Sequence, residues 1–429
     1  MSAHRIVEAS PDTPLVWFEI AMNGGASLDP VGAEGLHRHA ALLARRGAGA
    51  RDRAALDDAL DGMGAALELH VSRDAMSLSG LALSRHVDAV IDLAADILAA
   101  PRFSEDEHAR LLRETPQVLD ELRDDDSSLA TRWFDWTCAP GHVYGRTSIG
   151  TEASLARIAE GGRQEAAALW QREVVADNLT LGFAGDVSET TAERLATRLT
   201  DRLPAGPAPA LPTATGASAP AVRRALLVDK SERTQAQLRF GHLSVRYGDP
   251  DTAALAIAEA AFGGMFSSRL MQEIRVKRGW SYGAGCGLRR SRLPHWFEIW
   301  MAAGIDVAGA AVSLTLDLFA DYAANGPTDD EVDFARSYLV GSMPFHVATA
   351  RQRMQLAVRD AVFGLPDGFT ARLPEALASL AAADVRAACA RHFHPDRTTT
   401  VAVTTAEQAS TALAGAGAGA LEVVDHDAY

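Results

Sequence analysis

The feature that most constrains the fold of this chain is an internal duplication on either side of one Pro-rich segment. Residues 204–221 replace the periodic apolar pattern seen elsewhere with Pro, Gly, Ala and Thr, a composition typical of a linker. On its two sides, similar stretches recur in the same order, offset by about 220 residues. The matching pairs are 101–107 with 327–331, 155–158 with 377–380, and 176–181 with 395–400. We therefore predict two homologous domains, residues 1–203 and 222–429.

Local patterns within each half predict the same mixture of strands and helices. Alternating apolar and polar residues predict strands at 15–22 and 237–245, and a helical period predicts helices at 33–46 and 252–262. Strands come first and long helices follow. This order predicts an α+β fold in which helices pack on one face of a largely antiparallel sheet. The Ala/Gly repeat at 414–420 is expected to fray.

Composition excludes several classes of function. The formal net charge of -15 over 429 residues argues against a nucleic-acid surface, which needs a concentrated excess of Lys and Arg. Cys138, Cys286 and Cys389 are far apart and form no Cys-x-x-Cys pair, so buried reduced thiols are expected. We find no apolar core of a signal peptide near Met1 and no uninterrupted apolar stretch of about 18 residues, so neither secretion nor membrane insertion is expected. The expected location is the cytoplasm, or the periplasm if the N-terminus has been trimmed.

The most informative stretch runs from Phe262 to Cys286 and reads FGGMFSSRLMQEIRVKRGWSYGAGC. A Gly-rich turn, Ser-Arg-Leu, Glu-Ile-Arg and Arg-Gly-x-x-Tyr follow one another in this order. The stretch resembles the C-terminal half of pitrilysin/insulinase-type zinc peptidases, especially the bacterial two-chain members similar to mitochondrial processing peptidase. Further similarities at 24–36, 144–155, 177–186, 341–344 and 384–385 extend the resemblance over nearly the whole chain. The resemblance implies two α/β-roll domains.

In the active members of that family, His-x-x-Glu-His on the first helix holds the zinc, in the inverted zincin arrangement. The positions that correspond to the two His ligands and the Glu base are here Arg38, Leu42 and Ala41. Arg carries no free lone pair, Leu has no donor atom and Ala cannot accept a proton. The sequence therefore predicts that this chain binds no zinc, and the resemblance implies that Zn²⁺ is held by a partner subunit with an intact motif.

Neighbouring residues do not rebuild the motif. His37 and His39 are two positions apart, so on a helix they point roughly 200° away from each other and are expected to be ordinary or satisfied histidines. Glu114 and Glu121 match the Glu-x6-Glu segment of the family, in which the second Glu resembles the third zinc ligand. Without the two His ligands, Glu121 is expected to be a vestigial match with a structural role.

The resemblance assigns Arg275 and Tyr282 to substrate binding. In the family, an Arg-x6-Tyr pair lies in the C-terminal half and contacts the scissile peptide. A Tyr hydroxyl can stabilise the oxyanion of the tetrahedral intermediate, and an Arg can bind substrate carbonyls through its fork of donors. From the pattern, Arg275 is expected to end a helix that Gly279 terminates, and Tyr282 to lie on a strand whose other face, at 281, 283, 285 and 287, is bare enough to admit a peptide backbone. The alternative interpretation is a solvated helix-terminal cation and an ordinary strand aromatic.

Other candidates are weaker. The Gly-Gly-Met-Phe-Ser turn lacks the Lys-Ser/Thr of a phosphate loop, and no Ser or Cys lies in a nucleophile motif. His392 and His394 are two positions apart and are expected to lack carboxylate partners. The basic run 288–292 is expected to be a solvated loop.

Three hypotheses for the function remain open at this stage. In the first, the chain is the zinc-free subunit of a heterodimeric metallopeptidase, inactive alone, with an HxxEH-containing homologous partner and unfolded peptides as substrates. In the second, it is a structural or assembly protein of the same fold without catalysis. In the third, a homodimer forms a peptide-binding chamber.

Overall fold

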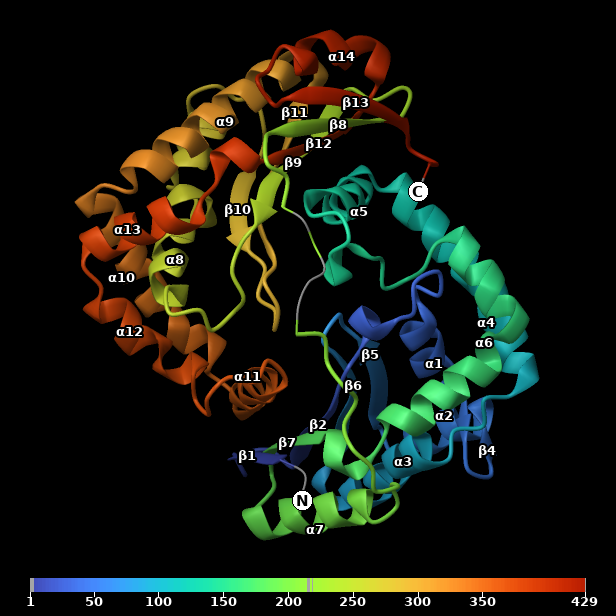
Figure 1. The fold of residues 1–429 in the computed structure, drawn as a ribbon. Helices are drawn as coiled ribbons and strands as arrows, with labels where there is room; N and C mark the ends of the chain where they lie inside the picture. The colour runs from blue at the N-terminus through green and yellow to red at the C-terminus, as the bar shows by residue number, and fades with distance from the viewer. Residues whose placement is uncertain (1–3, 214–216, 218, 429) are drawn as a thin grey trace. The chain divides into compact units, whose positions relative to one another are not determined.

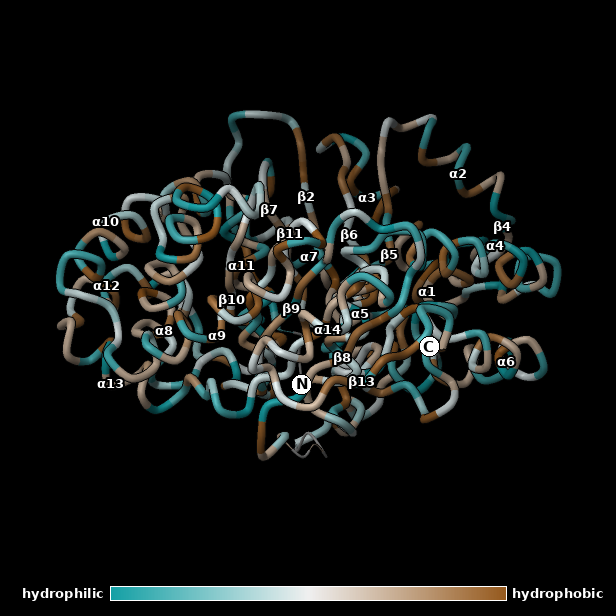
Figure 2. The backbone as a smooth tube through the Cα atoms, turned by 90° about the horizontal axis from the view of Figure 1, so that it is seen from above, coloured by the Kyte–Doolittle hydropathy of each residue, from teal (hydrophilic) through white to brown (hydrophobic). Residues whose placement is uncertain are grey.

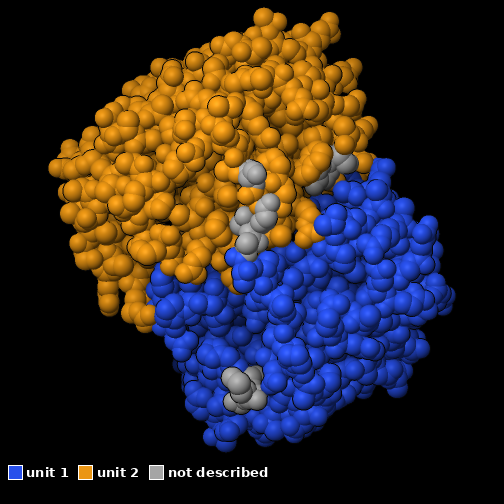
Figure 3. Space-filling model, viewed as in Figure 1, with its two compact units in different colours: residues 1–119, 147–213, 344–370 blue, residues 120–146, 214–343, 371–429 orange. Residues whose placement is uncertain are grey.

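The computed structural model describes residues 4–213, 217 and 219–428. Two compact units of similar size make up the chain, and Figure 3 shows them in blue and orange. Unit 1 contains residues 1–119, 147–213 and 344–370, and unit 2 contains residues 120–146, 214–343 and 371–429. Each unit thus takes one segment from the other half of the sequence. The proposed domain limits at 203 and 222 stay a prediction, because the units are defined by contacts and not by homology.

Unit 1 is built on a five-stranded sheet with the order β1-β7-β2-β6-β5. Its strands are β1 (His4–Ala9), β2 (Leu15–Asn23), β5 (Ala66–Val71), β6 (Ala75–Leu83) and β7 (Leu179–Gly185), and β3 (Gly47–Ala48) and β4 (Arg51–Asp52) form a separate pair. Only β1 and β7 run parallel. Strand β2 begins at Leu15, as predicted. Its alternating residues Val16, Phe18 and Ile20 are all buried on one face.

Several helices cover that face of the unit 1 sheet, and one helix covers the other (Figure 1). The helices are α1 (Leu36–Ala44), α2 (Arg53–Asp61), α3 (Val87–Ala99), α4 (Glu105–Asp124, whose last turn falls in unit 2), α6 (Glu152–Glu173), α7 (Glu189–Thr200) and α11 (Ala350–Val362). Helix α11 packs on the second face, where the side chains are small. A side-chain carbon on Gly182 would lie 2.4 Å from the sulfur of Met354, so glycine at this position lets α11 approach closely.

Unit 2 contains a six-stranded sheet with the order β10-β11-β9-β12-β8-β13. The strands are β8 (Arg224–Asp229), β9 (Gln235–Leu243), β10 (Ala284–Leu288), β11 (Trp296–Gly304), β12 (Thr399–Thr404) and β13 (Ala420–Asp425). The Ala/Gly repeat does not fray as expected. Ala416 and Ala418 are buried, and β13 pairs in parallel with β8, because small side chains let this segment pack closely against the unit.

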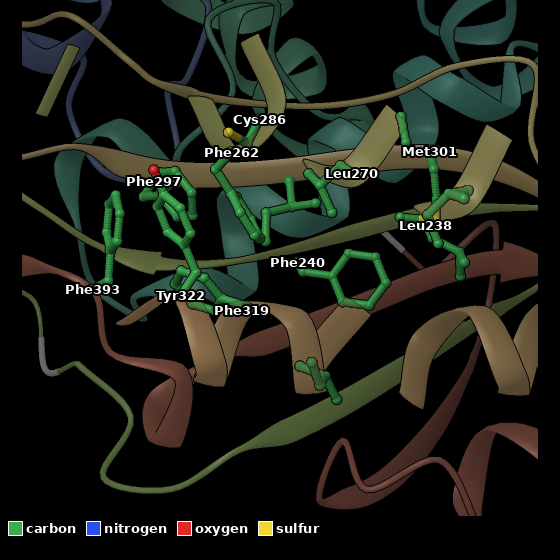
Figure 4. Close-up of a cluster of buried hydrophobic side chains, with 14 of the residues drawn as sticks. Leu238, Phe240, Phe262, Leu270, Cys286, Phe297, Met301, Phe319, Tyr322 and Phe393 are labelled. Carbon is green, nitrogen blue, oxygen red and sulfur yellow. The ribbon is translucent and has the colours of Figure 1, made fainter. Parts of the chain in front are cut away.

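The helices of unit 2 repeat the arrangement of unit 1. They are α5 (Asp126–Cys138), α8 (Thr252–Glu259), α9 (Ala308–Asn325), α10 (Asp329–His346, whose last residues belong to unit 1), α12 (Leu373–Ser379), α13 (Ala382–His392) and α14 (Ala406–Ala414). The helices on the main face bury an aromatic cluster (Figure 4), in which Phe297 stacks on Phe319 with ring centroids 5.2 Å apart. Helix α5 alone packs on the opposite face, against β9 and β12.

The strand orders of the two sheets correspond one to one. Read from β1 in unit 1 and from β8 in unit 2, both sheets place a parallel pair first and then three antiparallel strands in the same connectivity, with β13 as an addition. The repeated sequence pair 176–181 and 395–400 forms the same local structure in both units, a short 3-10 helix followed by a strand. The repeated stretch 327–331 forms a capping box at the start of a helix. Thr328 and Glu331 exchange side-chain to backbone hydrogen bonds at the start of α10.

The α+β class predicted from the sequence is confirmed, and the structure adds a helix on the second face of each sheet. Along the helices the residues alternate between hydrophilic and hydrophobic (Figure 2), as the helical periodicity requires. One segment of the described chain, Ile305–Asn325, is long and apolar enough to cross a membrane by length and composition. Half of it is buried in unit 2, where α9 contributes Phe319 and Tyr322 to the aromatic cluster.

Candidate substrate-side site and the vestigial metal position

Arg275 and Tyr282 lie at the two ends of a tight turn in unit 2. Arg275 is in the π-helical segment Met271–Val276, and this rare helix type is often found at functional sites. The helix ends as predicted, because Gly279 has a φ of +66° and donates its N–H to the carbonyl oxygen of Arg275 at 3.0 Å. Tyr282 follows three residues later in a bend.

The guanidinium group of Arg275 lies between two exposed aromatic rings. Its central carbon is 4.5 Å from the centroid of the Tyr282 ring and 4.9 Å from that of Phe266. Both rings face solvent in this unit, Tyr282 with 87% and Phe266 with 66% of its surface exposed. Cation–π contacts of this kind fix the orientation of an Arg side chain at an energetic gain of about 0.5–1 kcal/mol at exposed sites.

No described residue accepts a hydrogen bond or forms an ion pair with the Arg275 guanidinium, so its N–H donors remain available. The neighbouring acid, Glu273, is occupied by Lys277 at 2.5 Å and by Arg278 at 2.6 Å. A second nearby cation, Arg269, has a structural role instead. Its guanidinium binds both carboxylate oxygens of Glu331, at 2.6 and 2.7 Å, and thereby ties this segment to the start of α10.

Two expectations about Tyr282 were wrong. Tyr282 does not lie on a strand, because β10 begins only at Ala284. The glycine-rich face beside it is not bare either. Gly285 pairs with Trp300 of β11, and a side-chain carbon on Gly285 would lie 2.4 Å from the indole ring. The glycine therefore accommodates Trp300 and not an incoming peptide backbone.

Phe266 was missed by the sequence reasoning. It lies in the Gly-Gly-Met-Phe-Ser turn, for which the sequence indicated no role of the aromatic residue itself. An aromatic residue in a short turn between two glycines and two serines, close in sequence to a candidate Arg, was the signal that could have identified it.

Helix α1 contains Arg38, Ala41 and Leu42, the positions that the sequence resemblance assigns to the metal site. Arg38 and Leu42 are half-buried and share one face of the helix, and Ala41 is buried beside them. Burial, and then the neighbouring charge of Arg46, lower the pKa of the Arg38 guanidinium, but an Arg remains protonated in proteins. A cation, a methyl group and an isobutyl group do not fit a zinc ion, so no step of a reaction is assigned to a metal in this chain.

The two histidines of helix α1 are satisfied core residues. His37 is fully buried, and its ring nitrogens contact Asp29 at 2.6 Å and Glu173 at 2.9 Å. Burial alone would lower the pKa of His37, but the two carboxylates outweigh it and raise the pKa to about 9. His39 contacts His108 at 2.8 Å, and burial lowers its pKa to about 4. Both histidines therefore have side-chain partners inside the protein, as the sequence led us to expect.

The carboxylates of the vestigial segment have separate environments. Glu114 of α4 pairs with Arg46 at 2.5 Å, and Arg46 also contacts Glu107 at 3.2 Å. Glu121, which resembles the third zinc ligand of the family in sequence, is exposed in the last turn of α4.

Two of the weaker candidates turn out to be engaged. His392 does have a carboxylate partner, since its Nε2 lies 2.7 Å from Asp251, which also accepts hydrogen bonds from Arg391. Asp249 completes a group of possible metal ligands there, but the Arg391 guanidinium already occupies the Asp251 carboxylate. Arg289, expected in a solvated loop, pairs with Asp135 and Glu298 at 2.8 and 2.6 Å. Tertiary contacts that the local sequence does not reveal explain both differences.

The three cysteines are free and buried, as predicted. Burial raises the pKa of the thiols of Cys138, Cys286 and Cys389, which keeps them protonated and unreactive.

The sequence of this chain is similar to those of several known proteins. Residues 163–339 match the family described as "Peptidase M16 inactive domain". Among curated relatives, the "Non-peptidase homolog YmxG" of Helicobacter pylori is 22% identical over 371 residues, 86% of this chain and 84% of that protein. The "Mitochondrial-processing peptidase subunit beta" of Lentinula edodes is 23% identical over 264 residues, 60% of this chain and 55% of that protein.

Solved structures show the same fold. A peptidase M16 inactive domain from Pseudomonas fluorescens superposes with a TM-score of 0.86 at 24% identity, covering 94% of this chain and 96% of that chain. A protease from Helicobacter pylori gives a TM-score of 0.84 at 16% identity, covering 94% of this chain and 98% of that chain.

The α+β fold of this chain is that of the solved M16 inactive domain, and its first helix carries Arg38, Ala41 and Leu42, which are not metal ligands. Over residues 163–339 the chain is similar to the inactive domain of the M16 peptidase family.

Proposed function

We propose that this chain is the zinc-free subunit of a heterodimeric M16 metallopeptidase, in which Arg275 and Tyr282 contact the peptide substrate. The observation that carries the proposal is the exposed stack of Phe266, Arg275 and Tyr282, in which the guanidinium is held in place while its donors stay free. An ordinary surface Arg gains little from such fixation, whereas a substrate-binding Arg gains a preorganised fork for a peptide carbonyl or carboxylate.

Tyr282 supplies a second kind of contact. Its hydroxyl can donate a hydrogen bond to the oxyanion that forms on the scissile carbonyl when the peptide bond is attacked. A donor aimed at this charge stabilises the transition state more than the ground state and therefore raises kcat. The contact between the Arg275 guanidinium and the Tyr282 ring favours one position of the hydroxyl.

The metal belongs to the partner in this proposal. Because Arg38, Ala41 and Leu42 cannot hold zinc, the partner must be a homologous subunit with an intact HxxEH motif, and the chain alone is inactive. Unfolded peptides are the expected substrates.

The test combines metal analysis and reconstitution. The purified chain is titrated with zinc and assayed on an unstructured peptide, alone and with an HxxEH-containing M16 subunit from the same genome. We expect no stoichiometric zinc and no hydrolysis from the chain alone, and hydrolysis from the pair. Tight equimolar zinc with activity in the isolated chain would contradict the proposal.

Tyr282→Phe in the reconstituted pair then tests the oxyanion role. We expect kcat to fall about 100-fold, which is the scale for loss of one oxyanion donor, with partner affinity unchanged. Tyr338→Phe is the matched control, because Tyr338 is a half-exposed tyrosine of helix α10 in the same unit.

A second function, a structural or peptide-binding role without catalysis, is favoured by one observation. A relative that covers most of this chain is named a non-peptidase homologue. If the pair assembles and Tyr282→Phe leaves kcat unchanged, this second function is supported instead.

A further inference from the structure

A pocket the size of one side chain opens in unit 1, on the face of the sheet where helix α11 packs. Its volume is about 160 Å³. A cavity of about 150 Å³ in another protein holds one benzene molecule, which gives the scale of a suitable occupant. The walls are formed by strands β2, β5 and β6 together with Arg351, Met354 and Gln355 of α11.

The register of the sheet arranges the walls in two rows. Glu19 of β2 lies opposite Ser79 of β6, and Ser79 lies opposite Glu68 of β5. The neighbouring row consists of Trp17, Leu81 and Ala66. Cross-strand neighbours on one face are about 5 Å apart, so an acidic row and an apolar row lie side by side within the reach of a single ligand.

Glu19 is the unusual member of the acidic row. It is half-buried, and its carboxylate makes no hydrogen bond or ion pair within the part of the chain that the structure describes. Burial raises the pKa of Glu19, whereas the charges of His70 and Arg351 oppose this rise. A carboxylate that is partly removed from water without a partner destabilises the fold, unless a cation binds beside it.

The other charged groups around the pocket leave it acidic. Glu68 is exposed at the rim and contacts His70 at 3.3 Å. Arg351 is exposed on α11 and is the cation among the residues lining the pocket. Among the residues that line the pocket there are two carboxylates and one guanidinium, so the lining itself favours a positively charged ligand.

We propose that this pocket binds one alkyl side chain ending in a guanidinium or ammonium group, as Arg or Lys of a polypeptide presents it. The cationic head would lie between Glu19 and Glu68, and the methylene chain would lie along Leu81 and Ala66. The Trp17 indole adds a cation–π surface next to the carboxylates. This site goes beyond the proposed function, because it lies in unit 1 and needs neither Arg275 nor Tyr282.

Calorimetry on the isolated full chain tests the proposal without a partner subunit. N-acetyl-arginine methylamide is titrated into the wild type, Glu19→Gln and Glu68→Gln. The matched control is Glu160→Gln, an exposed site on helix α6 with the same loss of charge. N-acetyl-citrulline methylamide has nearly the same shape without the charge, and butylguanidinium carries the head group without a peptide backbone.

We expect the arginine derivative to bind the wild type and Glu160→Gln equally, and to bind Glu19→Gln about tenfold more weakly, because a charge-assisted contact is lost. Glu68→Gln, an exposed substitution with no folding risk, is expected to weaken binding to a smaller extent. Tighter binding of the arginine derivative than of butylguanidinium supports a polypeptide source, and equal binding supports a site for alkylguanidinium groups in general. No binding to the wild type, equal binding of the citrulline derivative, or unchanged binding to both Glu variants overturns the proposal.

Discussion

The guanidinium carbon of Arg275 lies 4.5 Å from the ring centroid of Tyr282, so these two residues, one on each side of a helix end, are in contact on the surface. The turn that ends at Gly279 makes this contact possible. The turn brings the end of the π-helical segment close to the residues that precede β10.

The stack is expected to contribute to local order more than to global stability. Tyr282→Ala should lower the free energy of unfolding by less than about 1 kcal/mol, since a cation–π contact at an exposed site contributes about this much at most. A double-mutant cycle with Arg275→Met, measured by urea unfolding, isolates the coupling. A loss of several kcal/mol for Tyr282→Ala alone would show that the ring has a core role, contrary to its 87% exposure.

Arg275→Lys separates charge from geometry. Lysine keeps the positive charge but loses the planar fork, so in the reconstituted peptidase KM should rise about tenfold while kcat changes less. The comparison is Arg246→Lys, an exposed arginine of the same unit. If Arg275→Lys has the kinetics of the wild type, Arg275 acts only as a general positive charge or has no role in substrate binding.

Gly241→Ala should destabilise unit 2 strongly. A side-chain carbon on Gly241 would lie 2.0 Å from the backbone oxygen of Phe297 and 2.8 Å from the ring of Phe134 on α5, so the strand pairing or the helix must move. We expect a loss of about 3 kcal/mol, at the upper end of the cost of overpacking. Gly341→Ala is the control, because that position in α10 has open space around it, and alanine should stabilise the helix by up to about 1 kcal/mol. Urea midpoints measure both, and equal midpoints would contradict the packing argument.

The buried cluster of His37, Asp29 and Glu173 predicts a loss of stability at alkaline pH. The folded pKa of His37 is about 9, above its ordinary value of 6.5. Its contribution is therefore fully present below pH 6.5 and is lost as the pH rises to about 9. Unfolding free energies between these pH values should fall less steeply for His37→Gln than for the wild type, although the variant is less stable overall. His346→Gln, an exposed position, should keep the slope of the wild type. Parallel slopes for all three proteins would show that His37 does not titrate in this range.

Much of the architecture was predictable because it depends on local chemistry. The alternation in β2, the capping pair of Thr328 and Glu331 and the helix stop at Gly279 are all properties of neighbouring residues. The absence of metal ligands at Arg38, Ala41 and Leu42 follows directly from residue type. Arg275 could be selected from a motif, although its role stays a prediction.

Contacts between distant segments could not be predicted in the same way. The sequence determined the duplicated α+β pattern and the loss of the zinc motif, because periodicity and donor atoms are properties of the chain itself. Only the tertiary structure decided that Phe266 joins Arg275 and Tyr282, that Trp300 fills the space beside Gly285, and that Glu19 shares a pocket with Glu68. The physical reason is that strand register and the second-face helices α5 and α11 bring together residues that are far apart in the sequence, and no local pattern encodes those distances.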